Sequence, residues 1–197
     1  DIFFNKSNVT LKLPYSIKEA MKNGIVLSPE ERRHQGLVLS LNAATNSILS
    51  NLFKASNSLL KKNKNQFKAS KLALENLDFD IDRLNDEASN FSGGNQQKIV
   101  LGKCFHAKPK ILLLDEATRG IDVGAKDEIF ETMRKIAQQD TSVLFVSSEI
   151  EELIAICDRI LVLSEGQFVS ELFPKDFELE KILQLIFEKK NVHSKYN

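Results

Sequence analysis

What this sequence lacks narrows its function before any motif is considered. Its 27 basic residues are balanced by 27 acidic ones, so no net field favours nucleic acid or anionic lipid as a partner. It has no tryptophan and only two cysteines, Cys104 and Cys157, which fall on apolar helical stripes without metal-ligand spacing. We therefore expect buried free thiols rather than a disulfide. No apolar run approaches the ~18 residues of a membrane span, so any membrane attachment should go through a partner.

Apolar segments are present in an order that predicts an α/β fold. Hydrophobic residues make up 42% of the chain, enough for one domain, or one domain with a lobe. Short apolar runs alternate with helical patterns, which indicates a mainly parallel core sheet. Strands are expected at 25–27, 111–114, 143–146 and 160–163, and helices from Ser16 to Met21, after Gly124, after Glu149 and over 177–189.

The stretch from Phe91 to Asp122 carries the chemistry, and it begins with a candidate anion site. Ser92-Gly93-Gly94-Asn95 immediately precedes a helical apolar pattern. Backbone N–H groups at a helix N-terminus, with no Cβ in the way, bind phosphate well. A Ser-Gly-Gly sequence by itself is more often only a turn.

The same stretch ends in a pair of carboxylates. Ile111 to Leu114 is an unbroken apolar run typical of a buried parallel strand, and Asp115-Glu116 follows it directly. Ligands of open parallel sheets bind beyond the carboxyl ends of the strands. One carboxylate can hold Mg²⁺ and the other can orient an attacking water. An acidic pair at this position is alternatively a helix N-cap.

In this order and spacing, the two ends resemble the ATP-binding cassette (ABC) ATPases. FSGGNQQ looks like the signature motif, ILLLDE like Walker B, and Arg119 to Asp122 like the D-loop. The segments SGGNQQK and DEATRGIDVGAK are most similar to the second nucleotide-binding domain of bacterial monosaccharide importers of the ribose/galactose type. The resemblance runs from about residue 10 to about residue 170.

The resemblance implies a role for each of these residues in ATP chemistry. Asp115 would act on Mg²⁺, Glu116 on the attacking water, and Asp122 would couple two sites across an interface. The residues implied to grip the γ-phosphate of an ATP held by the opposite domain are Ser92, Gly93, Gly94, Asn95 and Gln96. The implied protein would hydrolyse ATP at the cytoplasmic face of the membrane.

The implied partners are all proteins. They are the first nucleotide-binding domain of the same polypeptide, the transmembrane permease subunits and, indirectly, a periplasmic or surface sugar-binding protein, with no nucleic acid. The resemblance also implies three parts: 1–40 as core with the Q-loop region, 41–108 as a helical subdomain ending in the signature helix, and 109–197 as core with Walker B, the D-loop and the switch region.

The chain departs from the family pattern at three places. Glu30 stands where the Q-loop usually has glutamine, which leaves a metal contact possible, and Glu149 stands at the catalytic switch position where histidine is common. None of the eight glycines forms the phosphate loop G-x-x-x-x-G-K-[ST]. The resemblance therefore implies a chain that begins after Walker A, and we expect residues 1–197 alone to show negligible hydrolysis.

Several alternatives remain open at this point. The basic cluster Arg32-Arg33-His34 is either a solvated loop or a contact to the membrane partner. A nucleoside importer is a near relative, although its second domain tends to lose the Walker B carboxylates. A non-catalytic cassette that only completes its partner's ATP site is a further possibility. A DNA-repair or translation ATPase is disfavoured by the modest helical insert and the neutral charge.

Overall fold

The computed structural model describes residues 2–4, 9–11, 16–51 and 62–187. They fall into two compact units, residues 1–145 and residues 146–197, which we describe separately. Among these described residues, no helix has both the length and the apolar composition that crossing a bilayer requires.

The first unit contains a three-stranded sheet in the order β3-β4-β5, formed by Ile25–Ser28, Ile111–Asp115 and Ser142–Val146. β3 and β4 are parallel, with Ile25 opposite Ile111. Leu112 and Leu114 of β4 are fully buried, as expected for a central strand. A separate antiparallel pair is formed by β1 (Ile2–Phe4) and β2 (Val9–Leu11).

Helix α1 (Ile17–Lys22) begins where the sequence predicts it. The Ser16 side chain accepts a hydrogen bond from the Glu19 amide, and the Glu19 carboxylate accepts one from the Ser16 amide. This capping box satisfies two amides that the first helical turn leaves unpaired. The helix ends before Gly24, whose φ of +84° is a left-handed conformation that favours glycine.

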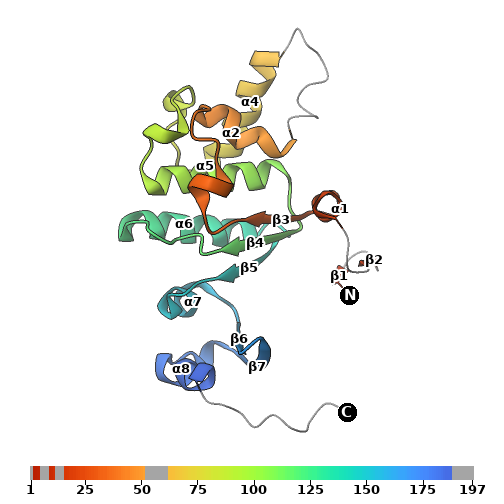
Figure 1. Ribbon diagram of the computed structural model, residues 1–197, viewed down its shortest axis with the longest axis vertical. Coiled ribbons are helices and arrows are strands. Elements are labelled where there is room, and N and C mark those ends of the chain that lie inside the picture. The colour runs from red at the N-terminus through yellow and green to blue at the C-terminus, as the bar shows by residue number, and fades with distance from the viewer. Residues whose placement is uncertain (1, 5–8, 12–15, 52–61, 188–197) are drawn as a thin grey trace. The chain divides into compact units, whose positions relative to one another are not determined.

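The other described α-helices of the first unit (Figure 1) are α2 (Ala43–Ile48), α4 (Lys62–Leu74), α5 (Gly93–His106) and α6 (Val123–Ala137). α2 and α4 pack against each other and against α5. Leu74 of α4 and Leu101 of α5 are almost completely buried. Short turns connect these elements: η1 (Arg32–Gly36), η2 (Leu49–Asn51), η3 (Glu75–Leu77), η4 (Ile81–Arg83) and η5 (Ala88–Asn90).

The second unit is built around an antiparallel hairpin of β6 (Ile160–Ser164) and β7 (Gln167–Leu172), flanked by α7 (Ile150–Ile156), η6 (Pro174–Asp176) and α8 (Leu179–Phe187). Its core consists of Ile160, Val162, Leu172 and Ile182. Strand β7 was not predicted, and the hairpin is antiparallel, so the mainly parallel arrangement applies only to the first unit. The predicted terminal helix begins at Leu179 rather than at Phe177, and its last two residues lie outside the described residues.

The α/β prediction is confirmed, and so is the prediction of free cysteines. Cys104 is buried, and burial raises the pKa of its thiol to about 12 because the thiolate is disfavoured away from water. Cys157 is half-buried, and burial and then Asp158 raise the pKa of its thiol. The predicted three-part division at residues 40 and 108 stays a prediction.

Candidate functional site

The signature residues form the first turn of α5. Ser92 is its N-cap, and the Ser92 hydroxyl accepts a hydrogen bond from the Asn95 side-chain amide at 3.3 Å and from the Asn95 backbone N–H at 3.5 Å. Gly93 and Gly94 are the first two helical residues. Unpaired N–H groups and the positive end of the helix dipole therefore occur where the sequence predicts an anion site.

The next residues of α5 point into the protein instead. Gln96 is buried, and its Nε2 donates to the Ala88 carbonyl at 3.0 Å. Its amide is thus used within the protein, and its predicted nucleotide contact stays a prediction. Gln97 is also buried and its Nε2 donates to Ser28 Oγ at 3.4 Å, which links α5 to the end of β3.

Burying the charged Lys98 side chain would be unfavourable by itself. Two partners compensate its charge. Its Nζ lies 2.6 Å from a carboxylate oxygen of Glu128 on α6 and donates to the Asp78 carbonyl at 2.8 Å. Its side chain is 8% exposed. Replacing Glu128 would remove the charge that compensates this buried ammonium, whereas the Glu128 side chain, 47% exposed, would stay solvated without Lys98. No motif in the sequence predicts this link between α5 and α6.

The residues predicted to hold Mg²⁺ and to orient the attacking water lie at the end of β4. Asp115 is the last residue of the strand, and Glu116 follows it; both are half-buried. Glu116 has φ of +48°, which costs a residue with a Cβ about 1–2 kcal/mol relative to a right-handed conformation. Four other described residues that are not glycine share this left-handed conformation, so φ by itself does not mark Glu116 as a functional residue.

Contacts at both ends hold the D-loop in place. Asp122 is the N-cap of α6, where its carboxylate accepts a hydrogen bond from the Ala125 amide at 3.0 Å. Arg119 forms an ion pair with Glu30. The predicted metal contact of Glu30 stays a prediction, and in this structure the carboxylate instead joins the segment after β3 to the D-loop.

The capping role of Asp122 can be separated from its predicted coupling role. We expect Asp122→Ala to lower the free energy of unfolding by about 0.5–2 kcal/mol, whereas Asp122→Asn, an equally good cap, should leave it nearly unchanged. Urea unfolding of both variants measures this difference. If asparagine destabilises as much as alanine, the cap is not what Asp122 contributes.

The signature turn and the D-loop pack directly against each other. A Cβ placed on Gly93 would lie 3.3 Å from the Gly120 carbonyl oxygen, and one on Gly94 would lie 2.8 Å from Ala125 Cβ. The second distance is too short for a real contact, so glycine is required there for this close approach. The candidate anion site and the loop that follows the carboxylate pair are therefore parts of one packed arrangement.

Glu149 belongs to the second unit, where it precedes α7. It occupies the N-cap position, but its side chain makes no capping hydrogen bond. The Ser147 hydroxyl accepts from the Glu149 amide at 3.0 Å and donates to Glu152 at 2.7 Å. Ser147 therefore joins the Glu149 backbone amide to the Glu152 side chain, and the catalytic role of Glu149 stays a prediction.

The two carboxylates at the end of β4 match a common way in which proteins bind Mg²⁺, with part of the ligands supplied by phosphate and water. Within the described residues, no group of three or more His, Cys, Asp or Glu side chains converges as a metal cage. Mg²⁺ at phosphate sites is usually held by one or two carboxylates together with phosphate oxygens and water. Asp115 and Glu116 supply that kind of partial donor set.

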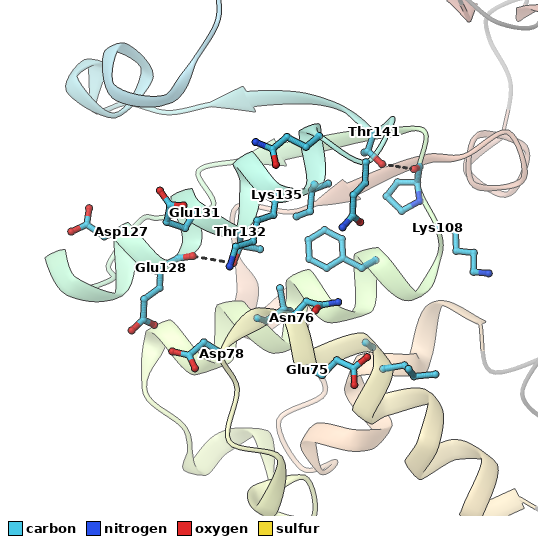
Figure 2. A pocket seen from close by; sticks show the side chains of 18 residues that line it. Glu75, Asn76, Asp78, Lys108, Asp127, Glu128, Glu131, Thr132, Lys135 and Thr141 are labelled. Carbon is cyan, nitrogen blue, oxygen red and sulfur yellow. Dashed lines mark hydrogen bonds between the residues drawn. The ribbon is translucent and has the colours of Figure 1, made fainter.

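A cleft of about 960 Å³ lies elsewhere in the first unit (Figure 2). Residues after α4, at the end of α5 and along α6 line it, and none of the predicted site residues is among them. Two of its acidic side chains, Glu128 and Glu131, are paired with Lys98 and Arg134. The other charged side chains that line the cleft are Glu75, Asp78, Asp127, Lys108 and Lys135.

A family model described as ABC transporter matches residues 7–119, which include the signature turn, Asp115 and Glu116. The chain belongs to the ABC transporter family. A ribose import ATP-binding protein of Clostridium tetani is 39% identical over 93% of this chain, which covers 36% of that relative. A xylose import ATP-binding protein of Moorella thermoacetica is 40% identical over 84% of the chain and 33% of its own length. The chain thus spans about a third of the length of these relatives.

Solved structures of similar shape agree with the family. An ATP-binding cassette in a dimeric post-hydrolysis state, bound to ADP and Pi, matches with a TM-score of 0.66 and 20% identity over 81% of this chain and 68% of that one. Another cassette of an ABC transporter matches with a TM-score of 0.69 and 18% identity, covering 85% of this chain and 70% of the other. The fold is therefore that of an ABC cassette.

Proposed function

We propose that this chain is part of the ATP-binding subunit of a monosaccharide importer, in which ATP hydrolysis drives sugar uptake. One observation carries the proposal: the N-terminus of α5, with Ser92, packs by Gly93 and Gly94 against the loop that follows Asp115 and Glu116. A phosphate-binding helix end and a carboxylate pair are thus held together. The names of the relatives, which are import proteins for ribose and xylose, support a sugar as the cargo.

The residues divide the chemistry between two nucleotides. Asp115 would hold Mg²⁺, which when bound neutralises charge on the phosphate oxygens. Glu116 would orient the attacking water and accept its proton. Ser92, Gly93, Gly94 and Asn95 would donate hydrogen bonds to the γ-phosphate of an ATP held by another cassette. Glu149 replaces a histidine at the switch position, so we expect slower hydrolysis at this site than at its partner.

We further propose that this is the second of two cassettes in one polypeptide. Its partners would then be the first cassette and the transmembrane permease subunits at the cytoplasmic face of the membrane, with a sugar-binding protein acting through the permease. The wording SGGNQQK and the glutamate at position 149 support this assignment. The segment 41–108, with α2 and α4 packed on α5, would be the helical subdomain that contacts the permease.

The proposal is tested by transport. The intact protein is reconstituted with its permease and binding protein in proteoliposomes, and uptake of labelled ribose, xylose, galactose and a nucleoside is measured with and without ATP. ATP-dependent uptake of one of the sugars is the expected result. Uptake of the nucleoside alone would assign the protein to the related nucleoside importers, and uptake without ATP would contradict an energy-coupling role.

A substitution at Gly94 tests the phosphate-binding turn. Gly94→Asp should abolish ATP-dependent closure of the two cassettes, because a carboxylate would face the γ-phosphate. Gly94→Ala is the matched control, since its Cβ meets Ala125 Cβ in the same way without adding charge. Crosslinking of the cassettes with and without ATP measures closure. Equal behaviour of the two variants would show that packing, not phosphate, explains the glycine.

A further inference from the structure

Arg32 makes contacts that its place in an exposed basic cluster does not predict. It begins η1, the turn after β3, and its guanidinium reaches the D-loop 87 residues later. Nη1 donates to the Arg119 carbonyl at 2.6 Å, and Nη2 donates to the Gly120 carbonyl at 3.4 Å. The planar guanidinium group thus donates hydrogen bonds to two successive carbonyls of the D-loop.

The signature turn lies close to the same guanidinium group. A Cβ on Gly93 would lie 2.8 Å from Arg32 Nη2, closer than real contacts allow. Gly120 has φ of +67°, a left-handed conformation that glycine adopts without strain. The Q-loop segment, the D-loop and the signature turn therefore meet at Arg32, and a side chain at position 93 would displace its guanidinium.

This arrangement is energetically demanding. Among the described residues, the buried Nε atom of Arg32 has no hydrogen-bond partner, and burial, followed by the neighbouring Arg33, lowers the pKa of the guanidinium. Desolvating a charged donor without pairing it is unfavourable. A lysine at this position would place all of its N–H donors on a single nitrogen, so it lacks the two separate coplanar nitrogens with which the guanidinium meets the two carbonyls.

We propose that Arg32 is a positioning residue that holds the Arg119–Gly120 backbone against the first turn of α5. In this way it fixes the signature turn relative to Asp122 and to the carboxylates that precede the D-loop. The ion pair between Glu30 and Arg119 acts on the same loop from the same segment. The functional part of this inference rests on the proposed ATP hydrolysis, whereas the structural part does not.

The structural part is tested by amide hydrogen exchange of the intact protein. Loss of a charge-assisted hydrogen bond is expected to speed exchange in the D-loop roughly tenfold in Arg32→Ala. Exchange in α4 and the melting temperature should stay at their wild-type values. Arg33→Ala is the matched control, because Arg33 is adjacent and exposed, and it should behave as wild type. Unchanged D-loop exchange in Arg32→Ala, or an equal change in Arg33→Ala, would overturn the proposal.

The functional part is tested by steady-state hydrolysis of ATP. Arg32→Ala should lower kcat roughly tenfold with KM for ATP changed less than twofold, and Arg32→Lys should fall between it and wild type. Gly93→Ala should lower kcat less in the Arg32→Ala background than alone, because the clash with Nη2 is gone. A wild-type protein without ATPase activity would contradict the proposed function and leave the exchange test standing. Altered D-loop exchange with unchanged kcat would refute the positioning role alone.

Discussion

Glu116→Gln in the intact protein should lower kcat for ATP hydrolysis by about 10²–10⁴-fold, the usual contribution of a positioned general base. Nucleotide affinity should change only a few-fold, since the amide keeps the shape of the side chain while lowering its basicity. Single-turnover hydrolysis and equilibrium binding measure the two quantities separately. Unchanged hydrolysis in single turnover at this site would contradict a catalytic Glu116 and favour a cassette that only completes its partner's site.

The backbone at Glu116 provides a matched variant for this experiment. Because φ is +48° there, Glu116→Gly should relieve about 1–2 kcal/mol of strain while removing the carboxylate. We therefore expect a protein that is at least as stable as wild type but as inactive as the glutamine variant. Lower stability in Glu116→Gly would show that the left-handed conformation is not strained.

Leu74→Ala should destabilise the first unit by about 2–5 kcal/mol, the range observed for fully buried leucines. Leu74 is 0% exposed and joins α4 to the signature helix at Gly102. Urea unfolding of the chain measures the loss, and amide exchange within α5 locates it. Leu72→Ala is the control on the same helix; Leu72 is 57% exposed, so a change within about 0.5 kcal/mol is expected.

A second substitution identifies the contact responsible. A Cβ on Gly102 would lie 2.6 Å from Leu74 Cδ2 and 3.2 Å from the Ala73 carbonyl oxygen. Gly102→Ala should therefore be destabilising in the wild-type background but partly restore stability in Leu74→Ala, because the added methyl group occupies vacated space. Strict additivity of the two changes would contradict direct packing at this point.

Local features of the fold were predictable because neighbouring residues determine them. The capping box of Ser16 and Glu19 and the buried strand ending at Asp115 depend on residues a few positions apart. Strand β7 was missed because its side chains are mostly exposed or half-buried, so no apolar run marks it. Its pairing with β6 depends on the turn at Glu165 and Gly166, where both residues have positive φ.

The contacts that organise the candidate site were not predictable for a different reason. The partners of Arg32 and Gln96 are backbone carbonyls, which every residue carries and no sequence pattern distinguishes. The pairing of Lys98 with Glu128 joins residues 30 positions apart on two different helices, which no local sequence pattern indicates. The motif supplies the residues that would meet the nucleotide, whereas the contacts that hold them depend on tertiary packing.

The three attachments of α5 together have a mechanical consequence. The helix is 14 residues long and therefore spans about 21 Å. Gly102 near its end is locked against Leu74, Lys98 ties its middle to α6, and Gly93 at its start touches the Arg32 guanidinium. With its start, middle and end each held by a different segment, α5 is expected to move as a rigid body, so a displacement of α4 would also displace the first turn of α5 and the D-loop.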